Sequence, residues 1–331
     1  MIANRKSLVV RLAGQAVLAE TRNKPSPCYN WWGKPLAMRR RIIVATVVGV
    51  ATGTFCWFLL KRLHQNAGDF QWAIHLAQRL VAGQNPYDTP LEQYPLPAAF
   101  VALPFLRMRP EIAAGLFYGI SSALLAFGLT RENFGRLRTF LAYPYWAGLL
   151  TAQWSTIIAA SAFFPALLPV TMMKPQVGLP IFLTRLSRRG LLACIFVAAL
   201  SIAIMPQWPM LWLRQTHYYE HYIPVLVFPG PLLLLALLRY RDRDAWLLIF
   251  SSMLPQRWFF DAFTLCLIPK SRRELVFTAL FSWGAGIWRW YHLPANFTEV
   301  GKAAVFFLYL PMLIVLLLRR ESGAEGLANP Q

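Results

Sequence analysis

The sequence predicts an all-α fold, a polytopic transmembrane helical bundle with roughly nine to eleven membrane segments. The composition, the long apolar runs and the placement of basic residues support this prediction. Apolar residues make up 57% of the 331 residues and charged residues only 14%. The mean hydropathy is +0.43. These values exclude a disordered chain, a disulfide scaffold and an ordinary soluble enzyme.

The apolar runs have the length that a membrane crossing requires. A helix needs about 20 apolar residues to cross a bilayer. Several uncharged stretches reach or approach that length, at residues 42–60, 112–130, 139–173, 190–213 and 222–238. The four cysteines form no CxxC pair and resemble small apolar fillers, so neither a disulfide nor a zinc site is expected.

The charge distribution predicts the topology. The chain has 33 Lys and Arg against 14 Asp and Glu, a net charge of +19. These bases stand at the ends of apolar runs, where the positive-inside rule and anionic lipids explain them without nucleic acid. Basic clusters at 39–41, 185–189, 239–243, 270–273 and 319–320 mark cytoplasmic ends. We therefore expect a protein of the plasma (bacterial inner) membrane with both termini in the cytoplasm.

Three regions follow from this topology. Residues 1–38 are polar and basic and lack the apolar core of a signal peptide, so we expect a dispensable cytoplasmic tail. Residues 39–320 form the transmembrane domain, and residues 321–331 form a second cytoplasmic tail.

The first outer loop, residues 61–110, is expected to hold helices at the membrane surface. Residues 70–82 place their apolar side chains on one helix face, with Asp69 as the N-cap and Gly83 just past the end. Residues 94–106 contain three prolines and are too short to span. This favours a re-entrant or interfacial helix that lines a cavity.

Later segments define the topology only in part. Residues 139–184 cross the membrane an odd number of times, either once or three times. Residues 244–270 have basic flanks at both ends, which favours a hairpin of two short helices with Pro255-Gln256-Arg257 at its outward tip. The aromatic residues at 208–222 are interpreted as an interfacial belt in preference to a sugar-stacking surface.

Because the chain has only 14 Asp and Glu residues, few acids are candidates for a functional site. Asp69 follows the first predicted span and shares a loop with the proline-rich segment, and it suits both a capping and a functional role. Asp261 falls within a membrane segment, where an acid is costly, and is either functional or a partner of Arg257. Lys174 and Arg257 are scarce bases beside apolar segments. No acid or histidine cluster demands a metal, and we expect no metal and no cofactor.

Several short motifs occur in an order that resembles a known family. They are Asp69-Phe70, Ala82-Gly83-Gln84-Asn85-Pro86-Tyr87, Tyr94-Pro95-Leu96-Pro97, Leu103-Pro104, Ala152-Gln153, Lys174-Pro175-Gln176, and Leu254-Pro255 followed by Trp258. In this order they resemble GT-C membrane glycosyltransferases over residues 40–290. The most similar are the polyprenol-phosphate-mannose-dependent mannosyltransferases of glycosyltransferase family 87. The chain departs from that family by a shortened segment around 153–184 and by the absence of a histidine just after Trp258.

The resemblance implies a hexosyltransferase that moves a sugar, mannose in that family, from a polyprenyl-phosphate donor to an extracytoplasmic acceptor hydroxyl. It implies Asp69 as the base of an inverting displacement, and Lys174 and Arg257 as the cations that bind the donor phosphate. Supporting candidates are Asp261, Gln153, Tyr87, Tyr94, Gln176 and Asp88.

The expected partners are the lipid-linked donor, a glycan or glycolipid acceptor, and membrane lipids. A multi-pass transporter or lipid flippase and a catalytically inactive GT-C relative remain as alternatives. The absence of visible internal repeats counts against the transporter. One outward-facing cavity lined by Asp69, Lys174 and Arg257 is the arrangement that favours the transferase.

Overall fold

The computed structural model describes residues 35–88, 94–294 and 296–319. All regular secondary structure in these ranges is helical, which confirms the all-α prediction, and one isolated bridge joins Tyr222 to Gln256. The chain divides into two units, Met1–Arg40 and Arg41–Gln331, and the packing described below is that of the second unit. The predicted tail at 321–331, and that at 1–38 up to residue 34, lie outside the described residues.

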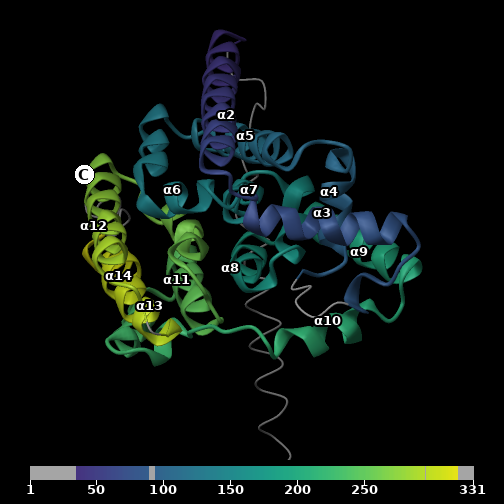
Figure 1. Ribbon diagram of the computed structural model, residues 1–331. Helices are drawn as coiled ribbons and strands as arrows, with labels where there is room; N and C mark the ends of the chain where they lie inside the picture. The colour runs from purple at the N-terminus through teal and green to yellow at the C-terminus, as the bar shows by residue number, and fades with distance from the viewer. Residues whose placement is uncertain (1–34, 89–93, 295, 320–331) are drawn as a thin grey trace, which may run out of the picture. The chain divides into compact units, whose positions relative to one another are not determined.

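Most of the helices are short (Figure 1). The α-helices are α2 (Pro35–Leu63), α3 (Gly68–Val81), α4 (Pro97–Ala102), α5 (Pro110–Leu129), α6 (Tyr143–Leu149), α7 (Ser155–Ser161), α8 (Pro175–Arg185), α9 (Arg188–Ile204), α10 (Trp208–Thr216), α11 (Arg243–Met253), α12 (Arg272–Tyr291), α13 (Phe297–Ala304) and α14 (Leu310–Leu318). The 3-10 helices are η1 (Pro86–Asp88), η2 (Leu103–Phe105), η3 (Phe134–Leu141), η4 (Pro165–Met172), η5 (Pro224–Leu226), η6 (Gly230–Arg239) and η7 (Phe259–Leu267), and η8 (Val305–Tyr309) is a π-helical turn.

Three helices are long and apolar enough to cross a membrane: Ala37–Leu63, Pro110–Leu129 and Phe297–Leu318. The number rises to four if α9 and α10, which meet at a bend of 97°, form one broken span. These helices suit a membrane protein. Among the described residues no further helix is both long and apolar enough, so the larger predicted number of membrane segments stays unconfirmed.

Prolines explain why the other apolar runs are divided. In the run at 139–173, Pro144 stands at the start of α6 and Pro165 at the start of η4. Proline lacks a backbone N–H and clashes with the preceding turn, so it starts a helix readily but does not continue one. The run therefore folds into η3, α6, α7 and η4 instead of one long helix.

α2 and α5 pack against each other through glycines. A Cβ atom placed on Gly53 would lie 2.7 Å from the carbonyl oxygen of Gly115, and one on Gly119 would lie 2.7 Å from that of Gly49. In each helix the two glycines stand four residues apart and leave the backbone uncovered, which lets the two helices approach closely.

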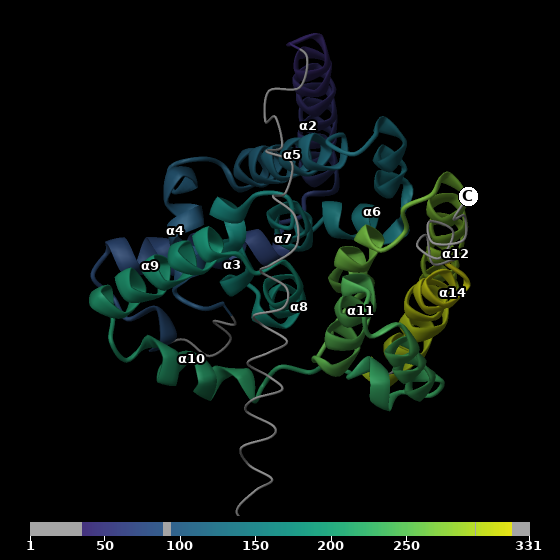
Figure 2. The same cartoon turned by 180° about the vertical axis from the view of Figure 1, so that it is seen from behind.

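α8, α11 and η7 form the part of the fold that positions the site. α8 packs on α7 and α11, and α11 also packs on η6 and η7. Figures 1 and 2 show α8 and α11 with α12 and α14 to one side and α3 and α9 to the other. The hairpin predicted at 244–270 is confirmed as α11 and η7, and an ion pair of 2.7 Å between Asp244 Oδ2 and Lys270 Nζ closes its base.

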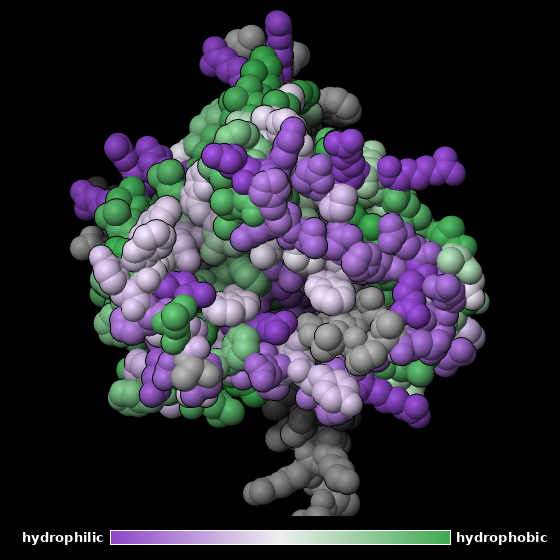
Figure 3. Space-filling view, viewed as in Figure 1, coloured by the Kyte–Doolittle hydropathy of each residue, from purple (hydrophilic) through white to green (hydrophobic). Residues whose placement is uncertain are grey.

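The amphipathic helix predicted at residues 70–82 is confirmed as α3. Its apolar face is buried through Phe70, Ala73, Ile74, Leu76 and Ala77. Its other face contributes to the polar surface in the middle of the view in Figure 3, while apolar surface covers much of α2 above it. This one-sided burial matches the helical spacing of the apolar residues.

Candidate functional site

A cavity of about 510 Å³ lies among α3, α8, α12 and the segment that joins α11 to η7. Its charged and amide lining residues are Gln65, Asp69, Lys174, Gln176, Arg257 and Arg289. Its aromatic lining residues are Tyr94, Tyr143, Tyr219, Trp258, Phe259 and Phe260. The cavity therefore combines one carboxylate and three cations with a largely aromatic wall.

Lys174 lies at the centre of a buried polar group that we call the lysine cluster: Asp69, Gln153, Lys174 and Asp261. Lys174 Nζ lies 3.0 Å from Asp69 Oδ2 and 2.8 Å from Asp261 Oδ1. It also donates to Gln153 Oε1 at 2.9 Å. Two of the three N–H donors of the ammonium therefore hydrogen-bond Asp69 and Gln153, and Asp261 adds an ion pair.

The surroundings keep Lys174 charged. Burial alone lowers the pKa of Lys174, but the carboxylates of Asp261 and Asp69 outweigh burial and raise that pKa above its ordinary value. Lys174 is therefore an ammonium at neutral pH, and it holds two acids that are far apart in the sequence.

Asp69 occupies a different position in α3 from the predicted one. The N-cap is Ala67, and Asp69 is the second residue of the helix and makes no capping hydrogen bond. The N-cap prediction is wrong because the helix begins two residues earlier than expected, at Gly68, whose φ of +26° suits glycine. Gly83 follows the end of α3 with a φ of +68°, as predicted. The Asp69 carboxylate is thus left to face Lys174, with 25% of its side chain exposed.

Asp261 closes the lysine cluster from the buried side. Its side chain is fully buried, and one oxygen pairs with Lys174. Its Oδ2 accepts hydrogen bonds from the backbone N–H groups of Arg257 at 3.0 Å and Trp258 at 3.4 Å. Of the two alternatives that the sequence left for Asp261, the structure shows an ion pair with Lys174 and a hydrogen bond from the Arg257 backbone.

Arg257 is positioned by aromatic rings at the mouth of the hairpin. Its guanidinium carbon lies 5.2 Å from the ring centroid of Tyr219 and 5.5 Å from that of Phe297. The Tyr219 hydroxyl accepts a hydrogen bond from Gln176 Nε2 at 3.0 Å. Arg289, from α12, lies 5.7 Å from the ring of Trp258. Two guanidinium groups therefore border the cavity in cation–π contacts.

Two tyrosines at the cavity stay protonated at neutral pH. Burial raises the pKa of Tyr94, and the charge of Asp69 and a hydrogen bond between the two side chains raise it further. Burial, followed by the charge of Asp261, raises the pKa of Tyr219 to about 12. Both phenols therefore remain hydrogen-bond donors beside the acids.

The structure brings most of the predicted site residues together. Asp69, Lys174, Arg257, Tyr94 and Gln176 line the cavity, while Gln153 and Asp261 hold Lys174.

Tyr87 and Asp88 lie outside the lining of the cavity. The buried Tyr87 donates its hydroxyl to the Tyr94 carbonyl at 3.1 Å. The exposed Asp88 accepts from Asn85 Nδ2. Tyr87 thus supports the segment that carries Tyr94, and Asp88 stays at the surface of its turn.

The sequence did not point to Tyr219 or Arg289. Tyr219 belongs to the aromatic residues interpreted as an interfacial belt, yet the bridge between Tyr222 and Gln256 fixes its segment to the hairpin tip. Arg289 comes from the last turn of α12. Neither position has a local sequence signal that separates it from an ordinary interfacial residue.

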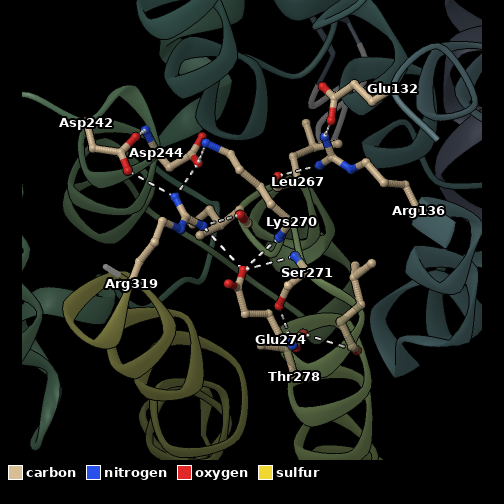
Figure 4. Close-up of polar contacts among 12 residues, drawn as sticks. Glu132, Arg136, Asp242, Asp244, Leu267, Lys270, Ser271, Glu274, Thr278 and Arg319 are labelled. Atoms are coloured by element: carbon tan, nitrogen blue, oxygen red, sulfur yellow. Dashed lines mark hydrogen bonds and ion pairs between the residues drawn. The ribbon is translucent and has the colours of Figure 1, made fainter. Parts of the chain in front are cut away.

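A second group of ions lies at the other ends of α8, α11 and η7. We call Arg185, Asp242, Asp244, Lys270, Glu274 and Arg319 the Asp244 network. Figure 4 shows Arg319 between Asp242, Asp244 and Glu274. Arg319 Nη1 lies 2.9 Å from an oxygen of each aspartate, and Arg185 lies 3.4 Å from Asp244. Three of the bases predicted at one common end of the apolar segments, Arg185, Lys270 and Arg319, therefore meet at Asp244.

The comparisons with known proteins supply no relative. No protein-family model matches the chain, and no curated protein or solved structure matches it. Among the described residues, no three His, Cys, Asp or Glu side chains are grouped to hold a metal ion. The function is therefore argued from the cavity and its chemistry.

Proposed function

We propose that this protein transfers a sugar from a polyprenyl-phosphate donor to an acceptor hydroxyl, with inversion and with Asp69 as the base. One observation carries the proposal: a partly exposed carboxylate, two arginines and an aromatic wall surround a single cavity. Its volume of about 510 Å³ is in the range of small-molecule sites. The choice of mannose and of a polyprenyl carrier rests on the family resemblance.

The reaction is a single displacement at the anomeric carbon. The acceptor oxygen forms a bond to that carbon while the bond from the carbon to the phosphate oxygen breaks. The hydroxyl proton moves to Asp69, and the electron pair leaves with the polyprenyl phosphate. A base on the face opposite the leaving group is what an inverting displacement requires, and the exposed quarter of the Asp69 side chain is available to an acceptor.

Lys174 takes a positioning role in this proposal, not the phosphate-binding role expected from the sequence. Its ammonium already donates hydrogen bonds to Asp69 and Gln153 and forms an ion pair with Asp261. A phosphate would have to displace one of them, which leaves a buried acceptor without its partner. Lys174 therefore fixes Asp69, which lies 3.0 Å from its Nζ, in the orientation that the reaction needs.

Arg257 and Arg289 are assigned to the leaving phosphate. Both line the cavity, and neither belongs to the lysine cluster. Guanidinium groups bind phosphate through two parallel hydrogen bonds, so one arginine recognises a planar pair of phosphate oxygens. Their aromatic neighbours Tyr219 and Trp258 hold the two charges at the wall of the cavity.

The test is sugar transfer by the purified full chain in lipid vesicles. The probe is radiolabelled polyprenyl-phosphate mannose, followed by other lipid-linked sugars, with extracted membrane glycolipids as acceptors. Asp69→Asn is expected to lower transfer about 10²- to 10⁴-fold, the usual contribution of a general base. Glu111→Gln is the matched control, because Glu111 is an acid of the first turn of α5, outside the cavity.

Three outcomes contradict the proposal. Retention of most activity by Asp69→Asn removes Asp69 as the base. Donor binding by the wild type without transfer from any lipid-linked sugar favours the inactive relative. Movement of the intact lipid-linked sugar across the vesicle membrane favours the flippase.

A further inference from the structure

An apolar groove of about 610 Å³ runs along the contact between α2 and α5, away from the polar cavity. Its floor is formed by glycines of both helices, and its sides include Val50, Leu116 and Ile120. These three side chains are 63%, 44% and 51% exposed. The groove is therefore open along its length.

The length of the groove matches one leaflet of a bilayer. On α2 it extends from Thr46 to Trp57, which at 1.5 Å per residue is about 16 Å. Half of the hydrocarbon core of a bilayer is about 15 Å thick. A membrane-spanning helix from another chain would need about twice that length, whereas one lipid chain fits.

Among the three candidate spans, α2 is the one that the rest of the protein covers least. Only 17% of its most apolar window is buried, against 67% in each of the other two candidate spans. Residues 49, 53, 115 and 119 along the groove are glycines that pack against the other helix and add no side chain to the groove. A flexible hydrocarbon chain fills an irregular groove of this kind by van der Waals contact.

Positive charge stands at one end of the groove. Arg41 precedes Thr46 by just over one helical turn and donates from Nη2 to the carbonyl of Phe127 at 3.0 Å. Its guanidinium carbon lies 4.3 Å from the Phe127 ring. Its buried Nε has no hydrogen-bond partner among the residues that the structure describes.

A second guanidinium adds to this charge. Arg131 follows the C-terminal end of α5 and is close enough to Arg41 for the two charges to repel each other. An anion between Arg41 and Arg131 would relieve that repulsion.

We propose that the groove binds one acyl chain of an anionic phospholipid, with the lipid phosphate at Arg41 and Arg131. The chain runs from the level of Thr46 toward Trp57. The site is independent of the sugar-transfer proposal, because none of its residues lines the polar cavity.

Photo-crosslinking of the purified full chain tests the acyl-chain site. The probe is phosphatidylglycerol with a diazirine near the end of one acyl chain, and the adducts are mapped by peptide mass spectrometry. Adducts are expected on residues 50–57 and 112–120. Val50→Trp fills the groove and is expected to lower this labelling about tenfold.

Val47→Trp is the matched control, because Val47 is 60% exposed on the same helix but does not line the groove. Equal labelling of the two tryptophan variants overturns the proposal. So does crosslinking of α2 to a second copy of the chain, or competition by polyprenyl phosphate but not by excess unlabelled phosphatidylglycerol.

The headgroup assignment is tested separately. Arg41→Gln is expected to reduce the preference for phosphatidylglycerol over phosphatidylcholine about tenfold, because one charge-assisted hydrogen bond is lost. A purely structural role of Arg41 would lower the labelling by both lipids equally and would contradict the assignment. Lys61→Gln, at the Trp57 end of the groove, is expected to leave the preference unchanged. If Lys61→Gln reduced the preference more than Arg41→Gln does, the lipid phosphate would lie at the Trp57 end of the groove, and the proposal would be overturned.

Discussion

The lysine cluster and the Asp244 network are two buried ion groups at opposite ends of the same helices. Lys174 immediately precedes α8, which ends at Arg185, and η7 leads from Asp261 toward Lys270. In the lysine cluster, one base is shared by two acids and an amide beside an aromatic cavity. In the Asp244 network, one buried acid is shared by three bases from α8, the start of α12 and the end of α14.

The difference lies in what each group leaves accessible. Asp69 keeps a quarter of its side chain exposed in a cavity, so an acceptor can reach it. Asp244 is 2% exposed and is surrounded by its bases, so it joins segments and offers no reactive group. A buried ion pair is therefore a functional candidate only where one partner also faces a cavity. Substitutions in the two groups are expected to separate activity from stability.

Lys174→Met is expected to have the largest effect, because it acts on both properties. It leaves two carboxylates without their shared cation, and breaking a buried ion pair of this kind costs about 3–5 kcal/mol of unfolding free energy. It also releases Asp69, and a misplaced base is expected to lower kcat about 100-fold. The KM for the donor is expected to change little. Thermal unfolding in detergent and steady-state transfer measure the two effects.

Lys302→Met is the control for this variant, because Lys302 is an exposed lysine of α13. A large rise in the donor KM of Lys174→Met with an unchanged kcat would instead show that Lys174 binds the donor phosphate. Unchanged stability would show that the ion pairs of Lys174 contribute nothing to the fold.

Asp244→Asn is expected to affect stability alone. It removes the charge that holds Arg185, Lys270 and Arg319 together. The side chains of Lys270 and Arg185 are 51% and 31% exposed, so water compensates in part and we expect a loss of about 3 kcal/mol, at the low end of the range for buried pairs. Transfer per folded molecule should be unchanged.

Asp242→Asn provides the matched comparison, since Asp242 is 30% exposed and pairs only with Arg319 in the Asp244 network. We expect a loss below about 1 kcal/mol. Equal losses in the two aspartate variants, or a lower kcat in Asp244→Asn, would contradict the division between the two groups.

Arg257→Gln is expected to weaken donor binding without destabilising the fold. Loss of one charge-assisted contact to phosphate raises the donor KM about tenfold. Arg241→Gln serves as the control, because Arg241 is an exposed arginine at the opposite end of α11. A donor KM that is the same in both variants would remove Arg257 from the phosphate site.

High pH is expected to have the smallest effect, and Lys174 and Tyr219 of the cavity contribute to it. The folded-state pKa values of Lys174 and Tyr219 lie above their ordinary values of 10.5 and 10.0. The folded protein therefore binds more protons than the unfolded chain above about pH 10, and its stability falls as the pH rises from there. Thermal unfolding between pH 9 and 12 measures the slope. A slope that is identical in the wild type and Lys174→Met would exclude the contribution of Lys174.

Local patterns in the sequence predicted the elements that local forces determine. The apolar spacing at 70–82 predicted α3, and the two basic flanks of residues 244–270 predicted the hairpin that closes through Asp244 and Lys270. The charge and proline patterns also drew attention to Asp69, Lys174 and Arg257, which the fold places at one cavity.

Contacts between distant segments were not predictable in the same way. Lys174 reaches Gln153 across 21 positions and Asp69 across 105, and no local pattern encodes which acceptor a buried ammonium meets. The position of Tyr219 depends on the bridge between Tyr222 and Gln256. Hydropathy alone also does not register where prolines such as Pro144 and Pro165 divide an apolar run, so a single long helix does not form there.

The most direct test of the central claim is a single-turnover experiment on Asp69→Asn with bound polyprenyl-phosphate mannose. If Asp69 removes the acceptor proton, the dissociation constant of the donor stays at the wild-type value while the rate of sugar transfer from the bound donor collapses. A wild-type transfer rate together with weakened donor binding would contradict the account and make Asp69 a binding residue.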